Sequence, residues 1–222
     1  MTFKAPDSLS EQIARHLGQM IITGELKAGE RIQELRVASE LNVSRGSVRE
    51  AYLILERRHL IEILPRRGAV VSAMTPKHVR NVYEVNIVLL SHLAHRATLV
   101  WQDGDLPAFL QLLDEMQAFV ESRQVLDFHD ASFRFARMAY RFADNPYLEE
   151  IIEDLQPTIR RTYYYAIQKV QSEMEQSMQM FRDLMDRILA RDAEGAVKTL
   201  ERFGQHQCAL VLESLASPPS RD

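Results

Sequence analysis

Residues 42–58 of the 222-residue chain read NVSRGSVREAYLILERR, and this stretch decides the fold of the first third of the protein. Ser44 is a preferred residue for the start of a helix, and Arg45 and Arg49 follow it four residues apart on one helical face. The apolar stripe of the same helix consists of Val48, Ala51, Tyr52 and Leu55. A helix N-terminus already carries partial positive charge, so two arginines there indicate a strongly negative partner.

Two further helices are predicted before this stretch. The segment QELRVASELN, residues 33–42, reads as a short helix that buries Val37, Ala38 and Leu41. A longer helix is expected from Ser8 to Gly24, because Ser8 and Glu11 form a capping box at its start. Two short helices joined by a tight turn, the second beginning with serines and arginines, are typical of a helix-turn-helix.

A β-hairpin is predicted directly after these helices. The segment HLIEILPRRGAVVSAM, residues 59–74, contains two short apolar runs on either side of a turn formed by Pro65, Arg66, Arg67 and Gly68. No other part of the chain shows a convincing β pattern. The first 74 residues are therefore expected to form a winged helix-turn-helix, with three helices and a hairpin.

The residue types in this region suit contacts with double-stranded DNA. Hydroxyls such as those of Ser44 and Ser47 donate to phosphate oxygens, and Arg45 and Arg49 suit either phosphate or the paired acceptors of guanine. Gly46 leaves room for close approach, and the arginines of the hairpin tip extend the contact along the backbone or into a minor groove. The alternative is a solvated face in which the arginines pair with Glu50, Glu56 and Glu62.

The stretch AGERIQELRVASELNVSRGSVREAYLILERRHLIEILPRRGAVV, residues 28–71, resembles the winged-helix domain of the GntR family of bacterial transcription regulators. The resemblance covers roughly residues 8–72. It implies operator contacts by Arg36, Arg45, Ser47, Arg49 and Gly68. Gly46 departs from the family pattern, because a threonine or another small residue often occupies that position.

The remaining chain is predicted to form an all-α bundle, with helices at 76–101, 105–121, 125–142, 146–169, 173–190 and 192–215. We expect a DNA-binding domain over residues 1–74, a linker over 75–79 and a helical effector-binding and dimerisation domain over 80–222. Three segments of the second domain resemble the FCD domain of the FadR branch: NVYEVNIVLLSHLAHRA, DASFRFARMAYRFADNPYL and MFRDLMDRILARDAEGAVKTLERF.

Many FCD domains hold a metal ion through one aspartate and three histidines, but this chain lacks that set. Asp130 stands at the aspartate position, and the three histidine positions are occupied by Arg134, Phe181 and Phe203. Arginine stays protonated and phenylalanine has no lone pair, so neither binds a metal. We therefore expect no metal and no other cofactor. Asp130 and Arg134 are spaced to pair with each other.

The expected pocket is more apolar than in metal-binding relatives, since Asn86 replaces a frequent arginine and Leu90 a glutamate. One interpretation is a site for an apolar effector, such as a fatty acid or an acyl thioester, with Arg134 meeting an anionic group. The other is a pocket that the phenylalanines fill. Residues expected to line the pocket are Asn86, Asp130, Arg134, Arg161, Tyr164, Phe181 and Phe203.

Histidines elsewhere offer only weak alternatives for metal binding. His92, His95 and His129 would form a replacement site, and His206 lies three residues beyond the lost ligand position. Solvated or core histidines are the simpler explanation of the first three residues. His206 would restore only one metal ligand, and not the full set of one aspartate and three histidines.

Composition limits the remaining choices. The net charge of −4 divides unevenly: residues 1–74 hold 11 Lys and Arg against 9 Asp and Glu, and the rest hold the other 16 of 27 against 22 of 31. A single cysteine, Cys208, fits a reduced cytoplasm, and no segment suits a membrane span. No group of residues suited to catalysis is found.

We expect a homodimeric regulator, not an enzyme. The alternative from another class is a lipid- or small-molecule-binding module without operator binding.

Overall fold

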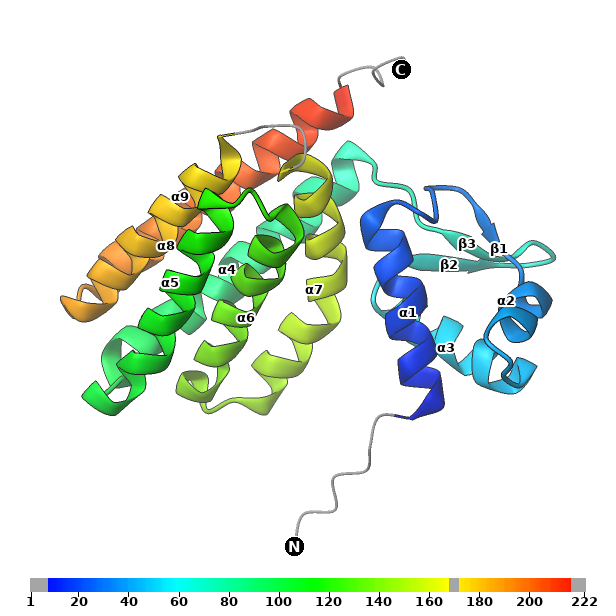
Figure 1. Cartoon of the computed structure of the whole chain (residues 1–222), viewed down its shortest axis with the longest axis horizontal. Coiled ribbons are helices and arrows are strands. Elements are labelled where there is room, and N and C mark those ends of the chain that lie inside the picture. The colour runs from blue at the N-terminus through cyan, green and yellow to red at the C-terminus, as the bar shows by residue number, and fades with distance from the viewer. Residues whose placement is uncertain (1–7, 168–171, 217–222) are drawn as a thin grey trace, which may run out of the picture. The chain divides into compact units, whose positions relative to one another are not determined.

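The computed structural model describes residues 8–167 and 172–216 and divides the chain into two compact units (Figure 1). The first unit contains the chain up to Thr75 together with Asp154–Arg161, and the second contains Pro76–Glu153 and the chain from Thr162 onward. The change of unit at Thr75 lies next to the domain boundary expected after residue 74. Asp154–Arg161 group with the first unit, although the sequence placed them in the second domain.

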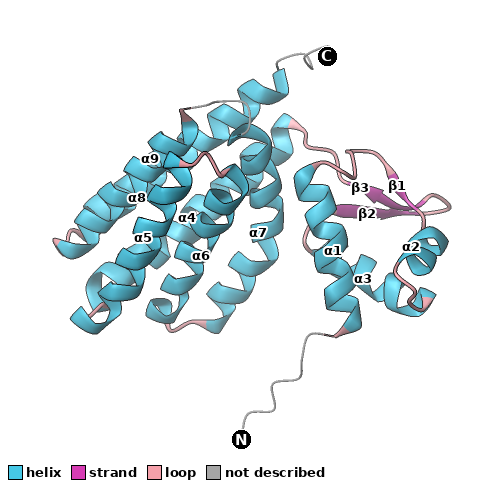
Figure 2. Ribbon diagram, in the orientation of Figure 1, coloured by secondary structure: helices cyan, strands magenta, loops and turns pink. Residues whose placement is uncertain are grey.

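Between residues 8 and 75 the chain forms three helices and a small antiparallel sheet (Figure 2). In chain order these elements are α1 (Leu9–Thr23), β1 (Arg31–Ile32), α2 (Glu34–Glu40), α3 (Arg45–Arg57), β2 (Ile61–Leu64) and β3 (Gly68–Val71). The predicted winged helix-turn-helix, with three helices and a hairpin, is confirmed.

The sheet contains one strand more than the sequence predicts. Its order is β1-β3-β2, and β1 pairs antiparallel with β3, so that Arg31 lies opposite Val70 and Ile32 opposite Ala69. A strand of two residues is too short to show the alternation by which strands are recognised in a sequence. The segment that contains β1 therefore resembles a turn in the sequence, and only its pairing with β3 identifies it as a strand.

Serine caps fix the starts of α1 and α3. The Ser8 hydroxyl accepts a hydrogen bond from the Glu11 amide at 3.2 Å, and the Ser44 hydroxyl accepts one from the Ser47 amide at 3.1 Å. Such caps satisfy amides that have no partner within the helix. The core of this unit includes Ile13, Leu17, Ile21, Val48, Leu55, Leu60, Ile61 and Val71. The caps and this core together set the direction in which the first turn of α3 faces.

The described chain from Pro76 onward is helical. Its helices are α4 (Pro76–Val100), α5 (Leu106–Glu121), α6 (Val125–Ala143), α7 (Pro146–Ile167), α8 (Glu173–Leu189) and α9 (Ala193–Ala216), with a short 3₁₀ helix at Asp103–Asp105. For these six helices, each predicted end that falls on described residues agrees with the structure to within one residue. The predicted end of α7 at residue 169 lies outside them. The linker expected at residues 75–79 lies mostly within the first turn of α4.

The loop between α6 and α7 shows how local chemistry sets these boundaries. Asp144 adopts a left-handed backbone with φ of 48°, which ends α6. The Asn145 side-chain oxygen then accepts hydrogen bonds from the amides of Tyr147 and Leu148, at 3.1 and 3.2 Å. Pro146 takes the first helical position, where its missing N–H is not needed. This turn chemistry is readable from the sequence.

In the second unit α4 packs along α9, and α5 packs against both α6 and α8. The core is rich in aromatic residues and methionine, and includes Phe109, Met116, Phe128, Phe135, Met178, Phe181 and Met185. None of the described helices is both long enough and apolar enough to span a bilayer.

Candidate nucleic-acid interface and bundle interior

The N-terminus of α3 is exposed and polar. The hydroxyls of Ser44 and Ser47 lie 2.9 Å apart, and Ser44 also caps the helix. Val48, in the next position, is completely buried, so the serines are held at the surface by the packing of the same helix turn. An exposed helix start with free N–H groups and hydroxyls is a suitable place for a phosphate oxygen.

Arg45 and Arg49 both reach one carboxylate, that of Glu34 at the start of α2. The Arg45 Nε lies 2.6 Å from Glu34 Oε1, and the Arg49 Nε lies 2.8 Å from Glu34 Oε2. These hydrogen bonds hold the pKa of the Glu34 carboxyl below its usual value, with Arg49 contributing more than Arg45. The two arginines therefore lie on one face of α3.

Two of the three acids of the alternative interpretation, Glu50 and Glu56, are engaged elsewhere. The Glu50 carboxylate accepts from the Ser10 hydroxyl at 2.7 Å, and the Glu56 carboxylate accepts from the Ile63 amide at 2.9 Å. Both contacts tie α3 to other parts of its own unit. The solvated face with Glu50 and Glu56 as counter-ions is therefore not the arrangement that the structure shows for Arg45 and Arg49.

Arg36 and Gly46 complete the predicted helix-turn-helix contacts. Arg36 is exposed on α2, and its Nε lies 2.7 Å from Glu40 Oε1 in a pair within one helix. A Cβ added at Gly46 would come no closer than 3.6 Å to its nearest neighbour, the Ser44 hydroxyl. The fold alone therefore does not require glycine at position 46.

The hairpin tip carries the other predicted cations. Arg66, Arg67 and Gly68 are all exposed, and they lie at the turn between β2 and β3. Arg66 and Gly68 have positive φ angles of 62° and 76°, a conformation that glycine adopts without penalty. The tip thus presents two adjacent arginines on a tight turn.

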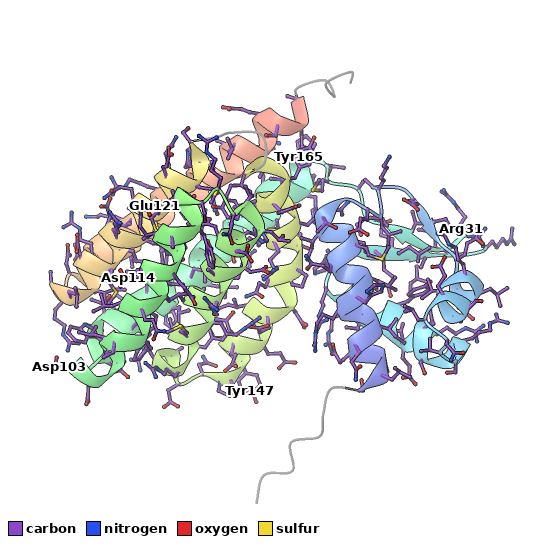
Figure 3. All side chains as sticks on the ribbon, in the orientation of Figure 1. Arg31, Asp103, Asp114, Glu121, Tyr147 and Tyr165 are labelled. Carbon is purple, nitrogen blue, oxygen red and sulfur yellow. The ribbon has the colours of Figure 1, made fainter. Side chains whose placement is uncertain are left out.

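Two residues of this surface were missed by sequence reasoning. Arg31 is exposed on β1, and its side chain extends outward from the sheet (Figure 3). Arg31 was not predicted as part of this surface, because β1 itself was not predicted. Glu34 could not be predicted, because its ion pairs with Arg45 and Arg49 form only when α2 packs against α3. No local sequence pattern indicates them.

Within the bundle, Phe181 and Phe203 belong to the aromatic core. The Phe181 ring contacts the Phe135 ring edge-on with centroids 5.1 Å apart, and its centroid lies 6.1 Å from that of Phe203. Phe181 is buried, Phe203 is half-buried and Asn86 on α4 is buried. Two of the three positions that hold histidine in metal-binding relatives, 181 and 203, are thus packed together, but with apolar rings.

Asp130 and Arg134 lie on the exposed side of α6, away from this aromatic core. About half of each side chain is accessible, 53% for Asp130 and 52% for Arg134. The Arg134 guanidinium forms an ion pair with Glu115 of α5. The buried neighbour is instead His129, which is fully enclosed and stacks on Tyr163 with centroids 5.6 Å apart.

Arg161 and Tyr164 lie one helical turn apart on α7 but in different surroundings. Arg161 groups with the first unit, where its guanidinium donates to the Ser72 carbonyl at 2.8 Å, and burial lowers its pKa to about 10. Tyr164 contacts the His129 ring edge-on at 5.4 Å. The structure therefore does not bring the seven predicted pocket residues into one site.

A buried polar cluster in the bundle was not predicted. Glu173, at the start of α8, is fully buried, and its carboxylate lies 3.0 Å from His206 Nε2 and 3.4 Å from the Ser177 hydroxyl. Ser177 also lies 2.8 Å from the Tyr163 hydroxyl, and burial raises the pKa of Tyr163. A glutamate in the first turn of a helix is ordinary in a sequence, so nothing there signalled its burial.

The residues present do not fit the metal centre of metal-binding FCD domains. A guanidinium and two phenyl rings offer no lone pair in place of imidazole. Among residues 8–167 and 172–216, no group of three or more His, Cys, Asp or Glu side chains is placed to hold a metal ion. His129 is surrounded by the rings of Phe133, Tyr163 and Tyr164.

Comparison with known proteins identifies both parts of the chain. Residues 9–71 match the model of bacterial regulatory proteins of the gntR family, and residues 81–206 match that of the FCD domain. Both matches favour a DNA-binding regulator over a lipid-binding module that lacks operator binding.

The similarity to known proteins extends over most of this chain and most of each relative. The chain is 27% identical to the HTH-type transcriptional repressor RspR of Escherichia coli, over 89% of this chain and 86% of the relative. It is 24% identical to the gluconate operon transcriptional repressor of Bacillus subtilis, over 94% and 81%. The structure of E. coli McbR/YncC superposes with a TM-score of 0.82 at 22% identity, covering 95% of this chain and all of that one. The chain thus belongs to the gntR family of bacterial regulatory proteins, in the FadR subfamily that carries an FCD domain, and is a DNA-binding transcriptional regulator.

Proposed function

We propose that this regulator binds double-stranded operator DNA as a homodimer, with α3 of each copy in the major groove. The observation that carries the proposal is the exposed face of α3, which presents Arg45 and Arg49 in the first two turns after the Ser44 cap. Helix-turn-helix proteins read base edges from the first residues of this helix. The hairpin tip then contacts the backbone or a minor groove beside it.

A dimer would place two such helices on successive half-sites of a near-palindrome. Exposed apolar residues on α4 support a contact between copies, since Val85, Val88 and Leu99 are 47%, 65% and 53% accessible. A second copy would remove this surface from water. We place the regulator in the cytoplasm with the DNA that it binds.

The DNA-binding residues are tested by Arg45→Ala and Arg49→Ala. Each substitution is expected to weaken binding to a duplex selected by the wild-type protein by about 1–3 kcal/mol, because a base-reading arginine contributes that much. Fluorescence anisotropy measures the affinity, and Arg15→Ala on α1 is the control for loss of one positive charge. Unchanged affinity in both α3 variants would remove α3 from the interface.

The effector site is proposed to be apolar and free of metal, with a fatty acid or an acyl thioester as its ligand class. The loss of every histidine ligand at the family positions, and the rings of Phe181 and Phe203 in their place, support this choice. Binding would shift an existing equilibrium between arrangements of the two DNA-binding units in the dimer.

The contact of Phe181 with both Phe135 and Phe203 favours a second candidate. In this candidate, the rings fill the space that an effector occupies in relatives, and the protein binds DNA without sensing a ligand. Aromatic rings bury a large apolar area, so they are effective fillers.

Native mass spectrometry of protein purified from its host separates the two candidates. A dimer mass with a retained acyl ligand supports the effector site, and a dimer without ligand supports the filled bundle. In the filled case, Phe181→Ala should gain binding of dodecanoate, measured by calorimetry, because the substitution opens an apolar cavity. A stoichiometric transition metal would contradict both candidates.

A further inference from the structure

Glu34 bridges the two arginines of α3 from a different helix. Its two carboxylate oxygens are divided between them, Oε1 for the Arg45 Nε at 2.6 Å and Oε2 for the Arg49 Nε at 2.8 Å. The Glu34 side chain is only 21% accessible, whereas those of Arg45 and Arg49 are 55% and 64% accessible. The carboxylate thus lies below the arginines, and the guanidinium groups lie above it toward solvent.

We propose that Glu34 is a positioning residue for sequence-specific DNA recognition, which orients the guanidinium groups of Arg45 and Arg49 before DNA arrives. This role rests on the proposed contacts of α3 with DNA and extends them to a residue that itself touches no base.

The bonding edge of each guanidinium supports this role. A guanidinium group has five N–H donors in a rigid planar fork. In both pairs the carboxylate oxygen meets Nε, on the side of the fork nearest the chain. Neither bond uses a terminal nitrogen, and the two terminal nitrogens of a guanidinium group match the O6 and N7 acceptors of guanine. An arginine fixed by its Nε loses less rotational freedom when it binds a base.

The charge of Glu34 argues against a role in affinity alone. A carboxylate next to the interface repels phosphates, so it weakens the electrostatic attraction that all DNA sequences share. Arg49 and Arg45 keep Glu34 ionised, since their hydrogen bonds lower its pKa. A fixed negative charge at this position is unfavourable for general DNA binding, and it is explained by a gain in discrimination between sequences.

The Arg36–Glu40 pair shows the contrast. It joins one arginine to one glutamate within α2, and both side chains are exposed, at 71% and 57%. Such a pair on one helix surface contributes little and constrains little. Glu34 differs because it links two helices and engages two arginines at once.

The alternative is that Glu34 is only a counter-ion, which DNA displaces. The two roles predict different results for the ratio of specific to non-specific affinity. Removing a counter-ion raises affinity for every duplex by the same factor and leaves the ratio unchanged. Removing a positioning residue lowers the ratio.

The experiment compares Glu34→Gln and Glu34→Asp with wild type in the full-length protein. Affinity is measured by fluorescence anisotropy for a duplex selected by the wild-type protein and for a scrambled duplex of the same length. The control for charge is Glu25→Gln, whose native side chain bonds the Thr23 hydroxyl at the end of α1. Circular dichroism of every variant confirms that it folds.

We expect the specificity ratio to fall about fivefold or more in Glu34→Gln, the lower end of what one well-placed arginine contributes. Glu34→Asp keeps the charge but is too short to reach both arginines, so its ratio should fall while its affinity for the scrambled duplex stays unchanged. Glu25→Gln should keep the wild-type ratio.

Equal gains in affinity for both duplexes in Glu34→Gln, with a wild-type ratio in Glu34→Asp, would overturn the proposal. The Arg45→Ala and Arg49→Ala variants separate this outcome from failure of the proposed interface. If those two variants lose affinity and the Glu34 variants keep their ratio, only the role of Glu34 is refuted.

Discussion

Arg45 and Arg49 stand in the first turns of a helix, where the aligned peptide dipoles disfavour positive charge. The free protein offsets this with the carboxylate of Glu34, which takes one N–H from each arginine. In a DNA complex the phosphates supply negative charge as well. Glu34 could not be predicted from the sequence, because residues 11 and 15 positions apart meet only when α2 and α3 are packed.

Gly68 and Gly46 are predicted to respond differently to the same substitution. Gly68 has φ of 76°, so Gly68→Ala should destabilise the DNA-binding unit by about 1–2 kcal/mol, the cost of a left-handed residue with a Cβ. Gly46 lies in α3, where alanine is tolerated or preferred. Gly46→Ala should therefore keep its thermal stability, and its DNA affinity reports whether position 46 lies against the duplex. Thermal unfolding by circular dichroism and anisotropy titrations measure the two effects; equal stability losses would contradict the assignment.

At the scale of elements, the helices were predictable and the smallest strand was not. Ser8 and Ser44 indicate the starts of α1 and α3, because each hydroxyl accepts a hydrogen bond from the amide three residues later. β1 consists of two residues and exists only through its pairing with β3. Local signals therefore fix the elements that contain enough residues to show a period, and tertiary pairing fixes the rest.

The serine caps provide a matched test of structure against function. Ser8→Ala and Ser44→Ala each remove one helix cap and should each destabilise the protein by about 1 kcal/mol. Only Ser44→Ala should also weaken DNA binding, because the Ser44 hydroxyl lies at the exposed start of α3. Thermal unfolding and anisotropy on both variants give the comparison. A similar loss of DNA affinity in Ser8→Ala would mean that helix stability alone explains the effect.

The expected pocket shows a different limit of sequence reasoning. Alignment to a family gives the chain position of Asp130, Arg134 and Phe181, but it does not give the direction in which a side chain points. In the structure Phe181 faces the aromatic core, and the other two face solvent. A shift of one residue along a helix turns the side chain by about 100°, which moves it from a buried to an exposed face.

For the bundle as a whole, Phe181 should contribute more to stability than Phe203. Phe181→Ala removes a buried ring and is expected to cost about 3–5 kcal/mol, whereas Phe203→Ala removes a half-buried ring and should cost less. Thermal unfolding measured by circular dichroism ranks the two variants. Equal losses would show that both rings are equally enclosed in solution, in conflict with their different burial.

Taken as a whole, the molecule carries a net charge of −4, which on average repels DNA. Binding therefore depends on the local arrangement of cations on α3, α2 and the hairpin tip, and this arrangement predicts a steep response to salt. Each phosphate that is neutralised releases counter-ions, so a plot of log affinity against log salt should be linear with a negative slope. Substituting an arginine that contacts only phosphate should reduce that slope by about 1 and weaken binding to all sequences alike.

Arg66→Ala and Arg67→Ala at the hairpin tip are the variants for this measurement, and Arg96→Ala in α4 is the control for the same change in net charge. Anisotropy titrations between about 50 and 200 mM salt cover the range in which the effect is large. The control should keep the wild-type slope, because a charge outside the interface releases no counter-ions from the duplex. If Arg96→Ala changed the slope as much as the tip variants do, net charge rather than the local arrangement would govern binding, and the hairpin would have no assigned contact with DNA.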